Sequence, residues 1–237
     1  MVKEASIMVP FLYGFDHCLD AAHSMLHLTV QHPKLEHLLC VPCVSLQNSN
    51  AMRSETPDHA PYEKRVAAIL LELGIPASYG SDSGVPLQRE ATDLLSVGAD
   101  IYGRDQRLTP EVAARWQAMQ AAAAQQGVSL LLVSAFRSVE YQRQIWERKL
   151  AAGESVAQIL RVSAPPGYSE HHTGRAIDLT ASGCDPLTEA FEGTPEFAWL
   201  AAHAGTFDFS MPYSRGNRYG FIYEPWHWSA NETILGS

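Results

Sequence analysis

The sequence predicts a globular protein of mixed helices and strands. Alanine- and leucine-rich segments that begin with capping residues have helical spacing, and shorter apolar segments have the length of strands. Apolar residues make up 46% of the 237 residues and charged residues 18%, which is ordinary for a chain that buries a core. The length suits one large domain, or one domain with an appendage.

The first 51 residues differ in composition from the rest. They hold five of the ten histidines and three of the four cysteines, and all 13 arginines lie from Arg53 onward. His23 and His27 have the spacing of one helix face, which fits a second metal site, but histidines scattered in a segment of different origin are the better explanation. Met52 is an alternative start of the chain, which would make residues 1–51 an extension.

Residues 53–62 are polar, contain two prolines and predict a linker. A helix is predicted from Tyr62 to Gly74, followed by a turn-rich boundary at Ser81–Gly84. We therefore expect residues 1–84 to form an N-terminal extension without an assigned role, and residues 85–237 to form the main domain.

Helix and strand signals are clear between residues 109 and 152. Thr109 followed by Pro110 predicts a helix start, and the alanine-rich run continues to Gln126 before a glycine ends it. Residues 128–135 predict an apolar strand, and Ser138 can cap a helix that runs to about residue 152. Arg137 therefore lies at a strand-to-helix junction, a position that projects side chains into a cleft.

Further elements are predicted in the last third of the chain. Residues 175–179 alternate like a strand that turns Asp178 away from Ile177, and Gly174 permits a tight turn before it. Thr194 and Pro195 predict another helix start. Residues 219–228 predict the last strand.

Two histidines and an aspartate in the last third of the chain form a candidate metal site. The sequence S-x-H-x-x-G-x-A-x-D runs from Ser169 to Asp178, and Glu224-Pro-Trp-His227 follows 46 residues later. His171, Asp178 and His227 would leave the fourth position of a tetrahedral Zn²⁺ open for water. Because an open position permits hydrolysis, the motif predicts a hydrolase with one Zn²⁺ per chain.

The neighbouring charged residues suit the same chemistry. Zinc lowers the pKa of bound water toward ~7 and polarises a carbonyl group. A carboxylate must then move the proton to the leaving amine, and Glu224 lies three residues before His227. Arg137 is permanently charged, and its planar fork suits a carboxylate or an anionic intermediate.

Three separated motifs resemble the zinc D-alanyl-D-alanine carboxypeptidases of the VanY type. They are the two motifs above and a segment from Ser134 to Ser138, followed by Tyr141 and Gln142, that resembles the family's arginine segment. The resemblance covers roughly residues 86–237. It implies an α+β fold in which helices pack on a small antiparallel sheet that carries the zinc site.

The resemblance also implies roles for particular residues. It makes His171, Asp178 and His227 the zinc ligands, Glu224 the general base, and Arg137 the group that holds a substrate carboxylate or the developing oxyanion.

Other positions near the motifs are assigned less directly. Ser169 and Gln142 match positions near the bound peptide, and Trp226 is a candidate for lining the peptide groove, with core packing as its alternative. At His172 the family often has a polar residue other than histidine, so His172 is a competing ligand; the register of the motif favours His171.

The expected function is zinc-dependent hydrolysis of a peptidoglycan stem peptide, most simply release of its C-terminal D-alanine by a D,D- or L,D-carboxypeptidase. An endopeptidase that cuts, for example, between L-Ala and D-Glu is one alternative. A non-catalytic zinc domain that binds peptide is another, and Glu224 argues against it.

Charge and hydropathy restrict the partners. The net charge of −9 argues against nucleic acid, whose phosphates require a basic surface. There is no apolar run long enough to cross a membrane. Residues 1–6 lack the features of a secretory signal, which predicts a cytoplasmic location unless the start is misassigned or export to the periplasm or cell wall uses another route. The sequence does not define the oligomeric state.

Overall fold

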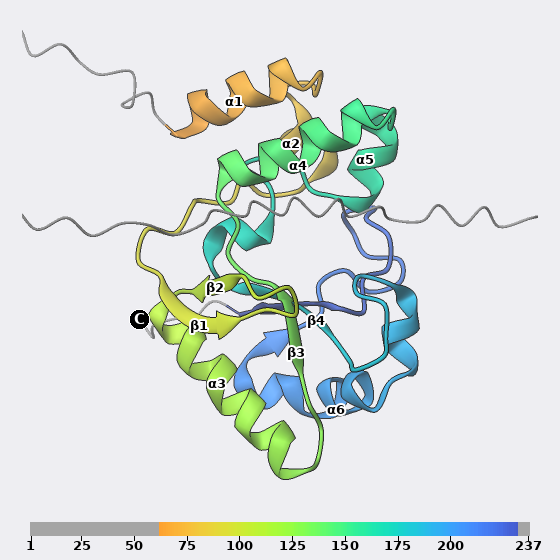
Figure 1. The fold of residues 1–237 in the computed structure, drawn as a ribbon. Coiled ribbons are helices and arrows are strands. Elements are labelled where there is room, and N and C mark those ends of the chain that lie inside the picture. Colours follow the sequence, from red (N-terminus) through yellow and green to blue (C-terminus); the bar gives the residue numbers. More distant parts are fainter. Residues whose placement is uncertain (1–61, 232–237) are drawn as a thin grey trace, which may run out of the picture. The chain divides into compact units, whose positions relative to one another are not determined.

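The computed structural model describes residues 62–231, in which helices pack around a small antiparallel sheet (Figure 1). This arrangement confirms the α+β class. In chain order the elements are α1 (Tyr62–Glu72), α2 (Tyr79–Ser83), β1 (Leu95–Ala99), β2 (Asp105–Leu108), α3 (Pro110–Gln125), β3 (Leu131–Ser134), α4 (Val139–Ala151), α5 (Val156–Val162), η2 (Glu170–Thr173), β4 (Ala176–Thr180), η3 (Glu189–Gly193), α6 (Pro195–His203), η4 (Ala204–Phe207), β5 (Phe209–Ser210) and β6 (His227–Ala230). The predictions for residues 1–61, including the histidine-rich segment and the alternative start, lie outside the described range.

Within that range the main sheet has the strand order β3-β4-β6-β5, and its neighbours are all antiparallel. The register pairs Ser134 with Asp178 and Asp178 with His227. All five residues of β4 are buried, as expected for a central strand covered on both faces. β1 and β2 form a separate antiparallel hairpin.

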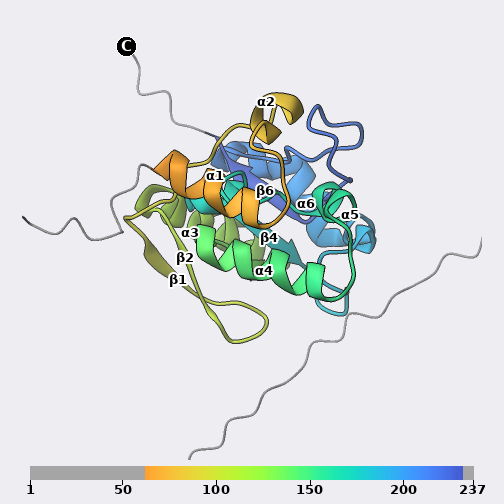
Figure 2. The same cartoon turned by 90° about the horizontal axis from the view of Figure 1, so that it is seen from above.

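Two hydrophobic clusters fill the interior. The sheet core contains Trp116 of α3, Ile177 of β4 and Leu200 of α6, each at most 1% exposed. The helical core joins α1, α2, α4 and α5 and includes Leu70 and Trp146. Figure 2 shows α1 running alongside α4, and the shared helical core gives the physical reason.

The helical core includes the part of the N-terminal segment that the structure describes. Val66 and Tyr79, from α1 and α2, are buried in the same cluster as Ile159 of α5. Val85, where the sequence predicts that the main domain begins, also belongs to this cluster. Residues 62–84 therefore pack as part of the same body as α4 and α5.

Elements with strong local signals form where the sequence predicts them. Thr109 precedes α3 with Pro110 in the first turn. Ser138 caps α4, where its side chain accepts a 3.0 Å hydrogen bond from the Tyr141 N–H. Thr194 caps α6 in the same way by accepting a hydrogen bond from the Phe197 N–H. These caps satisfy backbone donors that a helix start leaves unpaired.

The predicted strand over residues 219–228 is wrong for most of its length. Only its end belongs to a strand, β6, which starts at His227. The Ile222 N–H donates instead to the Arg161 carbonyl and the Glu224 N–H to the Tyr213 carbonyl. Pro225 has no N–H to give to a ladder. The aromatic residues that resemble a strand pattern are therefore part of a loop.

No helix between Tyr62 and Asn231 combines the length and apolar character needed to cross a bilayer.

Gly167 permits a close approach between α1 and the loop that precedes η2. Its φ is +87°, a left-handed conformation that residues with a Cβ adopt only at a cost. A Cβ at this position would lie 2.4 Å from Cγ1 of Val66. The position therefore needs glycine both for its conformation and for its contact with α1.

We predict that Gly167→Ala lowers the free energy of unfolding by about 2–4 kcal/mol, since the left-handed conformation and the overpacking against Val66 both add a cost. Denaturant titration measures this loss. Gly103→Ala is the matched control, because Gly103 has a φ of +77° but a Cβ added there would have no described atom within 4 Å. Equal losses in the two variants would show that the contact with Val66 contributes nothing.

Candidate metal centre

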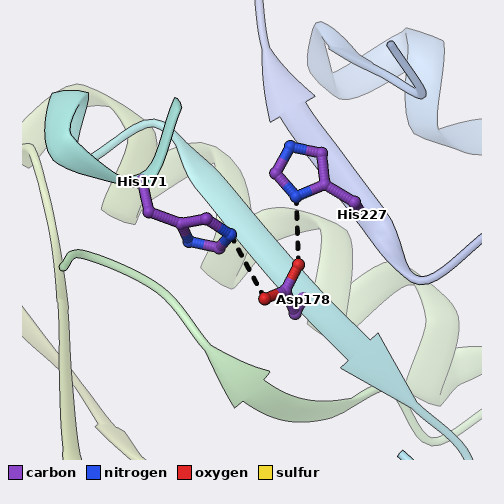
Figure 3. Close-up of side chains that lie close together, drawn as sticks. All are labelled: His171, Asp178 and His227. Atoms are coloured by element: carbon purple, nitrogen blue, oxygen red, sulfur yellow. Dashed lines mark hydrogen bonds and ion pairs between the residues drawn. The ribbon is translucent and has the colours of Figure 1, made fainter. Parts of the chain in front are cut away.

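Three side chains with metal-binding atoms converge where η2, β4 and β6 meet (Figure 3). His171 comes from η2, Asp178 from β4 and His227 from β6. One ligand atom from each lies within 4.8 Å of the others. The three residues are each at most 3% exposed, so the centre is buried.

The backbone explains why these residues meet. Antiparallel pairing sets Asp178 directly opposite His227. Gly174, with a φ of +63°, ends η2, and its N–H donates to the His171 carbonyl. The chain therefore turns from His171 into β4 within a few residues, as the sequence predicts for Gly174.

The Asp178 carboxylate lies between the two imidazole rings. Its Oδ1 is 3.0 Å from Nδ1 of His227, and its Oδ2 is 3.2 Å from Nε2 of His171. Figure 3 shows both rings directed toward it. Nε2 of His171, Nδ1 of His227 and the carboxylate thus surround one point.

The nitrogen of each ring that is remote from Asp178 is held by another group. Nδ1 of His171 is 2.5 Å from the Ala135 carbonyl, to which it donates, so its Nε2 keeps a free lone pair. Nε2 of His227 is 2.9 Å from Oε2 of Glu170 and donates to it. Such partners fix the tautomer and orientation of metal-binding histidines.

This donor set fits a zinc ion. Within residues 62–231, the buried Nε2 of His171 has no hydrogen-bond partner, although the Asp178 carboxylate lies near it. Two imidazole nitrogens and one carboxylate form a ligand set that Zn²⁺ prefers in catalytic sites, with a position left open.

The electrostatics of the centre also favour a cation. Burial and the charge of Arg137 lower the pKa of His171 to about 4, so its ring is neutral at pH 7, as a ligand must be. Burial opposes charge on His227, but hydrogen bonds to Asp178 and Glu170 raise its pKa to about 10. Surroundings that hold a proton this firmly favour positive charge, which a divalent cation would supply.

Ala135 connects the centre to the β1–β2 hairpin. Its carbonyl accepts from His171, and its N–H donates to Oε1 of Gln106 at 2.8 Å. The amide nitrogen of Gln106 donates in turn to the buried carboxylate of Asp100, also at 2.8 Å. The peptide that orients His171 is therefore itself held by a chain of buried polar groups.

Glu170 has a place in the centre that the sequence alone does not predict. Although burial opposes ionisation, the hydrogen bond from His227 and the charge of that ring lower the pKa of Glu170 overall. It is next to His171 in sequence but 57 residues from His227, the residue that it contacts. Only the fold reveals this contact, since no local pattern encodes it.

Glu224 lies close to the proposed ligands. Its N–H donates to the Tyr213 carbonyl, and its carbonyl accepts from the His227 N–H. Burial raises the pKa of the Glu224 carboxyl to about 7, while the charges of His227 and Arg137 act in the opposite direction. Its carboxyl group is thus set to exchange a proton near neutral pH.

Arg137 follows β3 and is anchored to η2, because its N–H donates to the His171 carbonyl. Its charge lowers the pKa values of both His171 and Glu224. The buried Nε of Arg137 makes no hydrogen bond to any described residue. A donor is thus available beside the proposed ligands.

The remaining predicted site residues are more deeply buried than Arg137 and Glu224. Ser169 is 3% exposed and directly precedes η2. Gln142 is 1% exposed, and its amide nitrogen donates to Oγ of Ser163 and to the Ala164 carbonyl. Trp226 is 7% exposed and lies in the sheet core, so core packing describes it better than the predicted position in a peptide groove.

His172, the competing ligand, is not part of the group around Asp178. Its Nδ1 is 2.6 Å from the Arg137 carbonyl, and its Nε2 accepts from the Gly167 N–H at 3.0 Å. Both ring nitrogens are therefore occupied. The geometry favours His171, in agreement with the register of the motif.

The fold is that of D-alanyl-D-alanine peptidases. The solved structure of the LD-carboxypeptidase LdcB is 28% identical and has a TM-score of 0.55, covering 61% of this chain and 71% of that one. The D,D-dipeptidase VanXYg, solved with a D-Ala-D-Ala phosphinate analogue, is 25% identical and has a TM-score of 0.52, covering 62% of this chain and 59% of that one.

The family described as VanY, D-alanyl-D-alanine carboxypeptidase, matches residues 105–230, and the chain belongs to this family. The D-alanyl-D-alanine carboxypeptidase of Enterococcus faecium is 28% identical over 138 residues, which are 57% of this chain and 41% of that protein. The chain spans less than half the length of the curated relatives that it matches.

We predict that Glu170→Ala weakens Zn²⁺ binding about 10–100-fold, because His227 loses the partner that orients it. Competition with a chromophoric chelator measures the affinity of the metal-free protein. Glu147→Ala, which removes an exposed acid on α4, should bind like wild type. His227→Ala should lose tight binding altogether.

Wild-type affinity in Glu170→Ala would show that Glu170 does not orient the ligand. One equivalent of zinc retained by His227→Ala would refute the assignment of His227 as a ligand.

Proposed function

We propose that this protein is a zinc-dependent carboxypeptidase that removes the C-terminal residue of a peptidoglycan stem peptide, as a D,D- or L,D-carboxypeptidase. The observation that carries the proposal is the Arg137 guanidinium, with its unpaired buried Nε, beside a His–Asp–His centre and a proton-exchanging carboxyl. The names of the relatives, which include D-alanyl-D-alanine and LD-carboxypeptidases, support the same class of substrate.

One Zn²⁺ would be held by Nε2 of His171, the Asp178 carboxylate and Nδ1 of His227. When bound, it supplies a Lewis acid that polarises the scissile carbonyl group and makes water more acidic. The protein contributes the orientation of the ligands, through the Ala135 carbonyl on His171 and the Glu170 carboxylate on His227.

Glu224 acts as the general base and then as the general acid. It takes a proton from the attacking water and gives it to the amine of the departing residue. A carboxyl with an ordinary pKa holds that proton poorly at neutral pH. Burial raises the pKa of Glu224 to about 7, which suits both halves of the transfer.

Arg137 recognises the terminal carboxylate of the substrate. Its planar guanidinium is always charged and can donate two parallel hydrogen bonds to a carboxylate. The bond from its backbone N–H to the His171 carbonyl ties it to a proposed ligand. The distance between the recognised carboxylate and the reacting carbonyl is therefore fixed, which limits cleavage to the last peptide bond.

Mass spectrometry of defined stem peptides incubated with the zinc-loaded protein tests this function. Tetrapeptides and pentapeptides with a free C-terminus should lose one residue. The same peptides with an amidated C-terminus should react at least about tenfold more slowly, since a hydrogen-bonded charge pair is lost. Equal rates, or internal cleavage, would indicate an endopeptidase, and binding without cleavage would indicate a peptide-binding domain.

We predict that Glu224→Gln lowers kcat about 10²–10⁴-fold, because the amide keeps the size of the side chain but cannot accept the proton. Zinc content, measured by elemental analysis, should remain that of wild type. Near-normal turnover with full zinc would show that another group handles the proton.

The dependence of wild-type activity on pH should show the ionisation of Glu224. Glu224 must be deprotonated to act as a base, so activity should fall as the pH falls through its pKa. Burial raises that pKa from 4.5 to about 7, and a nearby divalent cation lowers it again. We expect the acidic limb between these values, and its loss in Glu224→Gln.

A further inference from the structure

His172 is fully buried and does not belong to the group of three candidate ligands, although it follows His171 in sequence. Its Nδ1 donates to the Arg137 carbonyl, and its Nε2 accepts from the Gly167 N–H. A neutral imidazole has one donor and one acceptor, so this pair of bonds uses the whole capacity of the ring.

The proposed function places one of the two segments joined by His172 near the substrate, and the family resemblance implies the same of the segment that leads to Ser169. Arg137 carries the guanidinium that recognises the carboxylate, and Gly167 lies two residues before Ser169. The peptides on either side of Arg137 are both tied to η2: the Arg137 N–H donates to the His171 carbonyl at 3.2 Å, and the Arg137 carbonyl accepts from His172 at 2.6 Å. The base of the Arg137 side chain therefore has little freedom to move.

The loop on the other side of His172 is equally restrained. The Gly167 carbonyl accepts from the Gln88 N–H at 2.7 Å, and its backbone closely approaches Val66 of α1. The next residue, Tyr168, packs edge-on against Tyr79 of α2, with ring centroids 5.0 Å apart. Residues 66–88, which supply these contacts, lie outside the part matched by the family.

We propose that His172 is a positioning residue that fixes Arg137 relative to the Ser169 loop and thereby sets the preference for a free C-terminal carboxylate. This inference rests on the proposed function. Without the ring, the buried Gly167 N–H and the partly buried Arg137 carbonyl both lose their partner, which favours a movement of each toward a new one. Arg137 moves with its peptide, and displacements of about 1 Å are costly in an active site.

The test compares His172→Leu with wild type on stem peptides that end in a free carboxylate or an amide. KM for the free acid should rise roughly tenfold or more as the charged hydrogen bonds weaken. Zinc affinity and kcat should stay close to wild type, because the ligands and Glu224 are unchanged. The preference for acid over amide should fall. His203→Leu is the matched control, since it removes a histidine of α6 that packs on Trp199.

Two further variants separate positioning from general stability. His172→Gln keeps a donor and an acceptor and should restore much of the affinity. Combining His172→Leu with Arg137→Lys should raise KM little beyond the larger single effect, because both act through the same guanidinium. The proposal would be overturned if the two KM increases multiplied in the double variant. It would also be overturned if folded His172→Leu kept the wild-type preference for the free acid over the amide.

If His172→Leu does not fold, His172→Asn takes its place, since its shorter amide cannot reach both partners. Wild-type KM in His172→Asn would overturn the inference, and so would loss of the fold in both variants, which would make the residue structural. Failure of wild type to cleave any free-acid stem peptide would instead refute the proposed function, and this inference with it.

Discussion

The centre depends on one cross-strand pair, in which Asp178 of β4 lies opposite His227 of β6. A shift of one residue in this pairing would turn one of the two side chains to the other face of the sheet. The pair also concentrates negative charge in a buried place, because Asp178 and Glu170 both contact His227. Two carboxylates around one imidazole are costly to bury without a cation, so the same register that forms the sheet also makes the site suitable for a metal.

The support of the centre comes from parts that are distant in sequence. His171 depends on the Ala135 peptide, which depends on Gln106 and, through it, on Asp100 of the hairpin turn. Each link is a buried polar group with a partner, and such networks hold their members in one geometry. Loss of any link would free the proposed ligand His171 to move, even though the link itself lies outside the group of ligands.

The sequence allowed prediction of what depends on near neighbours. The caps at Ser138 and Thr194 and the turn at Gly174 act within a few residues, and the structure has them where they were expected. The convergence of His171, Asp178 and His227 followed from motif spacing and family resemblance. Contacts across the fold were not predictable: nothing local distinguishes Glu170 as a partner of His227. The error over residues 219–226 has the same cause, because distant carbonyls take the N–H groups that a strand would have used.

The close approach of Val66 to Gly167 shows that the folded body extends beyond the residues that match the family. The family match begins at residue 105, and every proposed ligand lies beyond it. The helical core, however, needs side chains from α1 and α2 to cover Trp146 and Ile159. A protein trimmed to the matched region would keep the three proposed ligands but expose an apolar surface beneath the loop that carries Gly167. Recombinant fragments designed from the homology limits alone would therefore be expected to aggregate, and fragments that begin before Tyr62 would not.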